Sequence, residues 1–260
     1  MPEKSIIFFD IDGTLLDHNK ELPASTEQAV QELKELGHEV AIATGRAPFM
    51  SKDIRDRLGI DTYVCYNGSY VVLKGELIYS HPLNKEALHN MTELALRHDH
   101  AVVYMGNEAM RASVPNDEFV AKSMNTFKLK YVPEHDPLYY HGREIYQSLL
   151  MCQEEEEAFY EEVFTAFDFV RWHPYSVDVV PSGGSKAIGI RKITEKLGIA
   201  PEHQYCFGDA LNDVQMLTMI TNSVAMGNGV PEAKAAAKYV TRPVDEDGIL
   251  YGLKMVGLLV

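Results

Sequence analysis

Two aspartates separated by one residue, Asp10 and Asp12, come directly after four apolar residues in the segment IIFFDIDGTLL. The end of a buried strand solvates carboxylates poorly, and like charges this close repel each other. A chemical role for the pair would explain the arrangement. A carboxylate can attack phosphorus to form an aspartyl-phosphate, while a second carboxylate protonates the leaving oxygen and later activates water. We therefore expect Asp10 to be a nucleophile and Asp12 a general acid and base.

Phosphoryl transfer also needs hydrogen-bond donors for the phosphoryl oxygens and a positive charge beside them. Thr44 and Gly45 follow HEVAIA, which is predicted to be a strand, so the Thr44 hydroxyl and the Gly45 amide can hold phosphoryl oxygens at a strand end. Lys186 lies in the first turn of a predicted helix and can neutralise charge. The chain thus offers each part that the reaction requires.

A third acidic residue, Asp209, follows the apolar segment YCFG and should lie at another strand end. Together with Asp10 it forms a hard, oxygen-rich site that suits Mg2+, an ion that prefers carboxylates, waters and substrate oxygens. The metal and Lys186 would compensate the acidic cluster, which otherwise would lose much of its charge by taking up protons. We expect Mg2+ as cofactor.

Two other interpretations of the first motif are weaker. Calcium ligands of an EF-hand would fall at positions 1, 3, 5 and 12, which are Asp10, Asp12, Thr14 and Glu21. However, the glycine required at position 6 is Leu15, and a strand rather than a helix precedes the loop. A simple Asp-Gly turn explains neither Asp10 nor the partners further along the chain.

The elements that position these residues alternate between strand and helix. Strands are predicted at 6–9, in HEVAIAT and in TYVCY, with a helix over about 26–36 and another closed by Gly59. Ser25 is the expected N-cap of the first helix, with Gln28 three residues later. This alternation predicts an α/β fold, a Rossmann-like, doubly wound parallel sheet that gathers ligands at the carboxyl ends of its strands.

The alternation stops after residue 66, where a hairpin is predicted to turn at Lys74-Gly75, and it returns at Ser185. We expect a catalytic core of residues 1–81 and 184–260, interrupted by an α+β domain over 82–183. Within this insert, the acidic run at 154–157 should open a helix and face water, with Phe159, Val163 and Phe167 pointing inward.

Composition excludes several classes of function. The 260 residues are 46% apolar, and the net charge of −14 with a pI near 5.1 argues against nucleic-acid or anionic-membrane partners. No basic stretch precedes a long apolar one, and no apolar segment is long enough to span a membrane. The three distant cysteines are expected to be reduced core thiols, so we expect a cytoplasmic protein.

The motifs DxDGT, TGR, a lysine and GDALND, in this order and with a large insert after the second, resemble the haloacid dehalogenase superfamily. Among its members the likeness is to Cof-like phosphatases with a type IIB cap. The segments NGSYV, VDVVPSGGSKAIGI, SVAMGNGVPEAKAAAKYVT and EDGI also resemble family segments, so the resemblance covers nearly the whole core. The insert matches only in its length and its closing strand.

The resemblance implies a role for each matching residue. Mg2+ would be bound by Asp10, the Asp12 main-chain carbonyl and Asp209, with Asp213 holding it through water. The phosphate contacts would be Thr44, Gly45, Lys186 and Asn212. Structural alternatives remain for three residues: Asn212 could be a helix N-cap, Asp213 could favour the first turn of that helix, and Arg46 could form only a structural ion pair.

We therefore expect a Mg2+-dependent phosphomonoester hydrolase that acts on a small phosphorylated metabolite, and sugar phosphates are the first candidates for the substrate. The alternatives are a phosphotransferase or phosphomutase using the same intermediate, and a non-catalytic regulator that binds phosphorylated metabolites. Asp178, on the predicted strand YSVDVV, is the candidate for substrate specificity, and its alternative is an exposed charge on an edge strand. The sequence leaves the substrate and the oligomeric state open.

Overall fold

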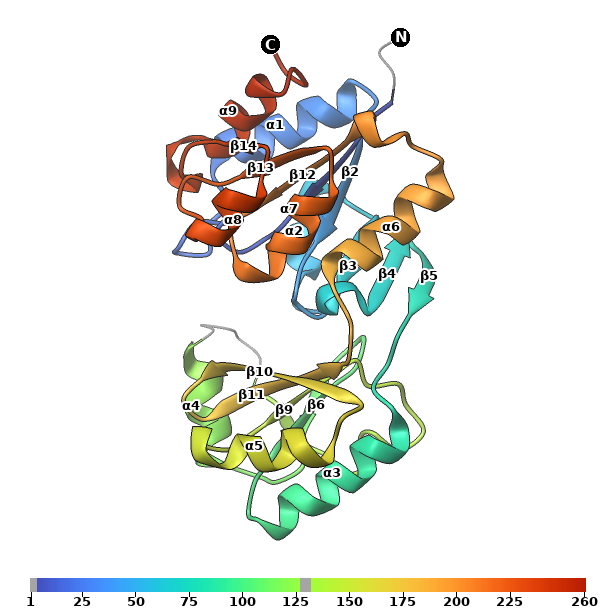
Figure 1. The fold of residues 1–260 in the computed structure, drawn as a ribbon, viewed down its shortest axis with the longest axis vertical. Coiled ribbons are helices and arrows are strands. Elements are labelled where there is room, and N and C mark those ends of the chain that lie inside the picture. Colours follow the sequence, from blue (N-terminus) through green and yellow to red (C-terminus); the bar gives the residue numbers. More distant parts are fainter. Residues whose placement is uncertain (1–3, 127–131) are drawn as a thin grey trace. The chain divides into compact units, whose positions relative to one another are not determined.

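The computed structural model describes residues 4–126 and 132–260, and the chain divides into two compact units. The first unit, which we call the core, contains Met1–Arg46, Met50–Ser80 and Ser185–Val260. The second, which we call the insert, contains Ala47–Phe49 and His81–Gly184. Figure 1 shows each unit built around a sheet of its own.

The core sheet has eight strands within the described residues, in the order β14-β13-β12-β1-β2-β3-β4-β5 (Figure 1). Its strands are β1 (Ile6–Phe9), β2 (Glu39–Ala43), β3 (Tyr63–Cys65), β4 (Tyr70–Leu73), β5 (Glu76–Ser80), β12 (Gln204–Gly208), β13 (Asn222–Ala225) and β14 (Tyr239–Val240). The strands from β14 to β3 pair in parallel, while β4 and β5 form an antiparallel hairpin. The hairpin turns at Lys74 and Gly75 as predicted, because both adopt positive φ.

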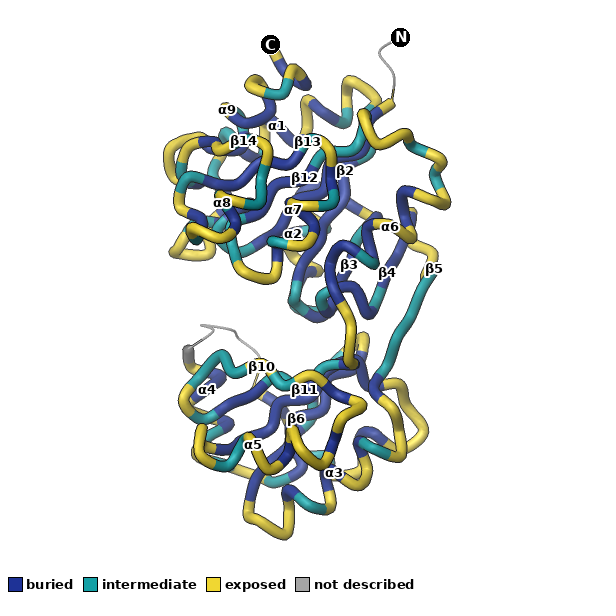
Figure 2. The backbone as a smooth tube through the Cα atoms, in the orientation of Figure 1, coloured by how far each residue is buried: buried dark blue, intermediate teal, exposed yellow. Residues whose placement is uncertain are grey.

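Helices cover both faces of the core sheet. They are α1 (Ala24–Glu35), α2 (Lys52–Leu58), α6 (Lys186–Leu197), α7 (Val214–Met219), α8 (Pro231–Ala236) and α9 (Gly248–Met255). The side chains of β1 alternate, so that Ile7 and Phe9 pack with α1, α2 and α9, and Ile6 and Phe8 pack with α6, α7 and α8. The central strands β1 and β2 are accordingly almost fully buried (Figure 2), and the prediction of a doubly wound α/β fold is confirmed.

The predicted cap of the first helix is wrong. Helix α1 begins at Ala24, and Pro23 is its N-cap residue in extended conformation, so Ser25 lies inside the helix and makes no capping hydrogen bond. Proline fixes φ in the range needed just before a helix and sets the start of α1 earlier than the Ser25 pattern indicates. The predicted end of α2 at Gly59 is confirmed, with Gly59 in the left-handed conformation.

The insert has a six-stranded sheet within the described residues, in the order β10-β11-β9-β6-β7-β8. Its strands are β6 (Val102–Met105), β7 (Met110–Ala112), β8 (Glu134–His135), β9 (Gln147–Leu150), β10 (Phe167–His173) and β11 (Ser176–Pro181), and its helices are α3 (Lys85–Arg97), α4 (Glu118–Thr126) and α5 (Glu154–Val163). Helices α3 and α5 pack on one face, where they share a hydrophobic cluster with β6, β9 and β11. Helix α4 packs against β11.

The predicted inner face of α5 is wrong. Phe159 and Val163 are 44% and 52% exposed, whereas Tyr160 and Phe164 join the hydrophobic cluster of the insert. Phe167 is buried, but it belongs to β10. The helix begins at Glu154 as predicted, behind a capping box formed with Gln153, and the pair four residues apart that packs into the cluster is Tyr160 and Phe164.

Two expectations from composition can be compared with the structure. Cys65, Cys152 and Cys206 are free and buried, as predicted for core thiols. Among the described residues, no helix combines the length and the apolar character that crossing a membrane requires.

Candidate active site

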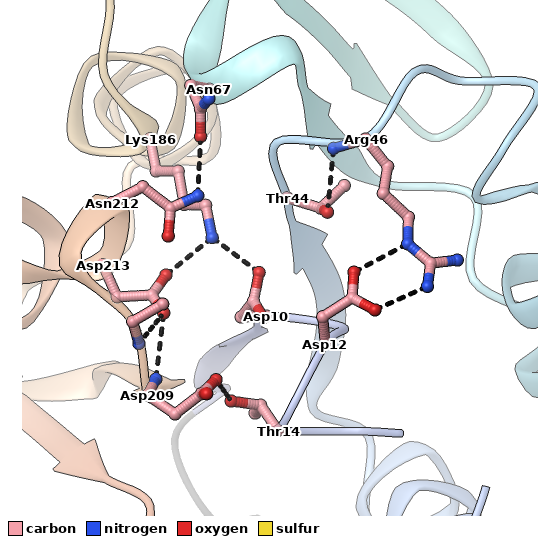
Figure 3. Close-up of polar contacts among 11 residues, drawn as sticks. Asp10, Asp12, Thr14, Thr44, Arg46, Asn67, Lys186, Asp209, Asn212 and Asp213 are labelled. Atoms are coloured by element: carbon pink, nitrogen blue, oxygen red, sulfur yellow. Dashed lines mark hydrogen bonds and ion pairs between the residues drawn. The ribbon is translucent and has the colours of Figure 1, made fainter. Parts of the chain in front are cut away.

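The carboxyl ends of three adjacent parallel strands deliver the central residues of the site. Asp10 follows β1, Thr44 follows β2 and Asp209 follows β12. The Asp10 amide donates to the Phe207 carbonyl at 3.0 Å and continues the pairing of β1 with β12 by one residue. The three strands thus place these residues at one edge of the core sheet, where their side chains converge (Figure 3), as the strand alternation predicted.

Lys186 supplies a buried positive charge at this edge. It is the first residue of α6, whose N-cap is Ser185, and only 1% of its surface is exposed. Its Nζ lies 2.5 Å from Asp10 Oδ1 and 2.6 Å from Asp213 Oδ1 (Figure 3). Burial alone would lower the pKa of Lys186, but the two carboxylates outweigh it and raise the pKa, so the ammonium stays charged.

Three carboxylates form an acidic cluster, which we define as Asp10, Asp209 and Asp213. Each offers an oxygen within 4.8 Å of the others. Burial raises the pKa of Asp10 to about 8 despite Lys186, and burial also raises the pKa of Asp209 to about 6. A divalent cation would favour the ionised forms, and hard carboxylate oxygens are the donors that Mg2+ prefers, so the residues present fit this ion.

Asp213 organises the loop that follows β12. Its Oδ2 accepts hydrogen bonds from the amides of Asp209 at 2.9 Å and Ala210 at 3.0 Å, and its Oδ1 accepts from Lys186. The residue is fully buried. Because both oxygens already have donors, Asp213 is better suited to hold a metal through water than to coordinate it directly.

The side chain of Asp12 lies apart from the acidic cluster and faces two cations. Arg46 donates from Nε at 2.7 Å and from Nη2 at 2.6 Å, and Lys20 Nζ lies 2.5 Å from Oδ1 (Figure 3 shows the Arg46 contact). Burial alone would raise the pKa of Asp12, but Arg46 and Lys20 outweigh it and lower the pKa. Arg46 therefore does form an ion pair, and its partner is the predicted acid and base.

The predicted phosphate contacts Thr44, Gly45 and Asn212 lie around the same edge. The Thr44 hydroxyl accepts from the Arg46 amide at 3.1 Å. Asn212 donates from Nδ2 to Asn67 Oδ1 at 3.0 Å, and it lies inside a short 3-10 turn whose N-cap is Ala210. The N-cap alternative for Asn212 is therefore wrong, and its exposed amide is free of a helix-capping role.

Asn67 is a site residue that sequence reasoning missed. Tyr66, Asn67 and Gly68 all have positive φ, of 51°, 48° and 103°, and such backbone conformations often mark functional positions. A Cβ on Gly45 would lie 3.2 Å from the Asn67 amide and 3.4 Å from Asn212 Nδ2, so the loop after β2 approaches both asparagines closely. The Asn-Gly pair in NGSYV was the available signal, because these types tolerate the left-handed region.

Thr14 and Asn228 also support the site and were missed as partners. Thr14 is fully buried, and its hydroxyl donates to Asp209 Oδ1 at 2.8 Å. Asn228 donates from Nδ2 to the Gly13 carbonyl at 2.8 Å and accepts from the Val244 amide at 2.9 Å. The fourth and fifth positions of the DxDGT motif, Gly13 and Thr14, are thus anchored by residues from the C-terminal part of the chain.

Asp178 belongs to the insert. It lies on β11 between β9 and β10, so the alternative of an exposed edge-strand charge is wrong. The residue is half-buried. Burial raises its pKa to about 7, although hydrogen bonds from the side chains of Gln147 and Trp172 act in the opposite direction.

The profile of one protein family, described as haloacid dehalogenase-like hydrolase, matches residues 7–253. The chain therefore belongs to this family and is a hydrolase of the phosphatase class, as the sequence motifs predicted.

Individual relatives cover essentially the whole chain. The Bacillus subtilis (strain 168) protein named "Putative phosphatase YkrA" is 48% identical over 257 residues, which cover 99% of each chain. A crystal structure of a Geobacillus kaustophilus HTA426 protein has a TM-score of 0.96 and 51% identity, covering 98% of this chain and 100% of the other. BT4131, described as a HAD subclass IIB sugar phosphatase, has a TM-score of 0.82 and 30% identity, with coverage of 98% and 100%.

Proposed function

We propose that the protein is a Mg2+-dependent phosphomonoester hydrolase that acts on small sugar phosphates through an aspartyl-phosphate at Asp10. The observation that carries this proposal is the position of Asp10. Its carboxylate lies beside the buried Lys186 ammonium and within the acidic cluster, at the edge where parallel strands gather ligands.

In the first step, an Asp10 oxygen attacks phosphorus and the ester oxygen leaves with a proton from Asp12. Lys186 neutralises charge on the phosphoryl group, while the Thr44 hydroxyl, the Gly45 amide and the Asn212 amide donate to its oxygens. Mg2+, held by Asp10, Asp209 and the Asp12 main-chain carbonyl and through water by Asp213, would supply further charge stabilisation.

In the second step, water attacks the phosphorus of the aspartyl-phosphate while Asp12 accepts its proton. The bond from phosphorus to Asp10 breaks, and inorganic phosphate leaves. Asp12 needs mobility for this role, because its carboxylate faces Arg46 and Lys20 in this structure.

We further propose that residues 82–183 form a cap that selects the leaving group, with Asp178 as one specificity residue. The description of BT4131 as a sugar phosphatase supports a sugar phosphate as substrate.

A hydrolysis screen tests the proposal. The protein is incubated with sugar, polyol and nucleoside monophosphates, with Mg2+ or with EDTA, and released phosphate is measured. We expect Mg2+-dependent release from a subset of sugar phosphates, and no release by Asp10→Asn. Phosphate transfer to a second sugar in place of release would instead identify a phosphotransferase, and full activity in EDTA would contradict the metal site.

A further inference from the structure

One face of the insert sheet carries polar side chains from the two neighbouring strands β9 and β11. Asp178 on β11 pairs with Leu149 on β9 and with Val170 on β10, and directly paired residues point to the same side of a sheet. By alternation, Ser176 shares this side with Asp178, and Gln147 shares it with Leu149. The opposite face, which includes Val177, is the one that α3 and α5 cover.

Two members of this group each have one buried side-chain atom without a hydrogen-bond partner among the described residues. Gln147 is 6% exposed and Ser176 is fully buried, yet in residues 4–126 and 132–260 neither Gln147 Oε1 nor Ser176 Oγ has a partner. The amide nitrogen of Gln147 is the atom that can donate to the Asp178 carboxylate, which leaves its oxygen as an open acceptor. An unpaired buried polar atom is unfavourable, so its presence requires an explanation.

Other residues on this face are partly exposed, whereas the two unpaired atoms themselves are buried. Val170 is 53% exposed, and Asp178 and Val180 are half-buried. Helix α4 packs against β11, where Phe119 stacks on Tyr175 with ring centroids 4.4 Å apart. Asp178 is therefore partly exposed, and Gln147 and Ser176 are its neighbours on the same face of the sheet.

We propose that Gln147, Ser176 and Asp178 form a subsite that binds hydroxyl groups of the leaving group. This inference rests on the proposed phosphatase function and names two specificity residues beyond Asp178. The subsite presents a carboxylate, an amide oxygen and a hydroxyl, so its ligand must mainly donate hydrogen bonds. Sugar and polyol hydroxyls do so, and they can also accept a hydrogen bond from Ser176. A ligand hydroxyl that pairs with Gln147 Oε1 or Ser176 Oγ removes the cost of leaving that atom unpaired. The subsite should therefore favour hydroxylated ligands over deoxygenated ones.

The test compares three kinds of substrate with Asp178→Ala, Gln147→Leu and Ser176→Ala. The substrates are hexose and pentose monophosphates, their singly deoxygenated counterparts, and p-nitrophenyl phosphate, whose leaving group has no such hydroxyls. For hydroxylated substrates we expect kcat/KM to fall about tenfold to a hundredfold, as loss of one hydrogen bond to a charged or buried partner implies. For p-nitrophenyl phosphate and for one deoxygenated sugar we expect little change.

Ser148→Ala is the matched control. Ser148 is also buried with no hydroxyl partner among the described residues, but it pairs with Val179 and Tyr104 on the face that α3 and α5 cover. It should leave the ratio of hydroxylated to deoxygenated substrates unchanged. Thermal melting shows whether each variant is folded, and Asp178→Asn, which keeps the size of the side chain, replaces Asp178→Ala if the latter unfolds.

Equal effects of the three variants on every substrate, or no effect on any, would overturn the subsite while leaving the phosphatase function intact. A higher kcat/KM of the wild-type protein for amino sugar phosphates than for the corresponding hydroxylated sugar phosphates would also overturn the subsite. That result would identify an ammonium as the ligand of Asp178. If the wild-type protein hydrolysed no ester in the panel, the proposed function would fail and the subsite with it.

Discussion

Lys186 is the residue on which the charge balance of the site depends. Its ammonium is the buried cation between Asp10 and Asp213, and burying either carboxylate without it would be strongly unfavourable. In a phosphatase the same ammonium meets the phosphoryl group, which every substrate shares. Removal of the Lys186 ammonium should therefore lower kcat/KM for all substrates by the same factor.

We expect Lys186→Met to lower kcat/KM uniformly across sugar phosphates and p-nitrophenyl phosphate. Removal of one group that stabilises transition-state charge typically reduces the rate by about a hundredfold to a thousandfold. The measurement is a set of kcat/KM ratios between substrates, with folding checked by circular dichroism. Ratios that differ from those of the wild-type protein would show that Lys186 selects substrates.

Asn67 allows a side-chain role to be separated from a backbone role. Its positive φ suits glycine, and a left-handed alanine costs about 1–2 kcal/mol. We expect Asn67→Gly to keep its melting temperature but to lose activity, because Asn212 loses the acceptor that holds its amide. Asn67→Ala should lose both. Full activity of Asn67→Gly would limit Asn67 to a backbone role.

The sequence could predict these site residues only where the chemistry was local. Asp10, Asp209 and Lys186 follow apolar segments or open a helix, so a parallel sheet must gather them. The partners of Asp12 and Asn212 come from other loops, and their contacts depend on a run of positive φ angles that composition does not specify. Arg46 was therefore considered only as a structural ion pair, and Asn67 was missed.

At the scale of elements, the loop after β3 must pack closely against the start of α6. A Cβ on Gly68 would lie 2.0 Å from the Ser185 carbonyl oxygen, directly before Lys186. Gly75, in the β4-β5 turn, also has positive φ, but an added Cβ there would meet nothing within 4 Å. Both glycines therefore have a positive φ, but only at Gly68 would an added Cβ clash with a neighbouring residue.

We expect Gly68→Ala to reduce both stability and activity, because the clash displaces the start of α6 and with it Lys186. Gly75→Ala should lower the free energy of unfolding by only about 1–2 kcal/mol, the strain of a left-handed alanine, and leave kcat unchanged. Urea unfolding and kcat with p-nitrophenyl phosphate measure the two effects. Equal results for the two variants would mean that the contact with Ser185 does not position the site.

Element types were more predictable than their faces and ends. Continuous apolar runs predicted β1 and β2, which are buried on both faces of the sheet, and a period-3.6 pattern predicted α6, which buries one apolar face against the sheet. The start of α1 lies two residues before the predicted one, because Pro23 begins the helix earlier. The inner face of α5 is offset by one residue from the predicted face, which corresponds to about 100° around the helix axis.

For the whole molecule, metal binding should be linked to pH and to stability. The folded-state pKa values of Asp10 and Asp209, about 8 and about 6, exceed the ordinary value of 3.8. Between pH 4 and these values the folded protein holds more protons than the unfolded chain, so without metal both groups make stability fall as pH rises. Mg2+ must displace those protons at low pH and meets ionised carboxylates at high pH.

We therefore expect Mg2+ to raise the melting temperature more at pH 8 than at pH 6, compared with EDTA at each pH. Asp10→Asn should reduce this difference, because it removes the group with the higher pKa. An equal or larger effect of Mg2+ at pH 6 would contradict the assignment of Asp10 to the metal site.

The central claim is that Asp10 becomes phosphorylated, and Asp12→Asn allows this to be observed. p-Nitrophenolate leaves without a proton, so the first step should survive, while the second step lacks its base and the intermediate should accumulate. We predict a burst of one p-nitrophenol per protein molecule, followed by slow turnover. Borohydride reduction and peptide mass spectrometry should then find homoserine at position 10. A wild-type protein that turns over, together with a variant that shows neither a burst nor a modified Asp10, would contradict the account.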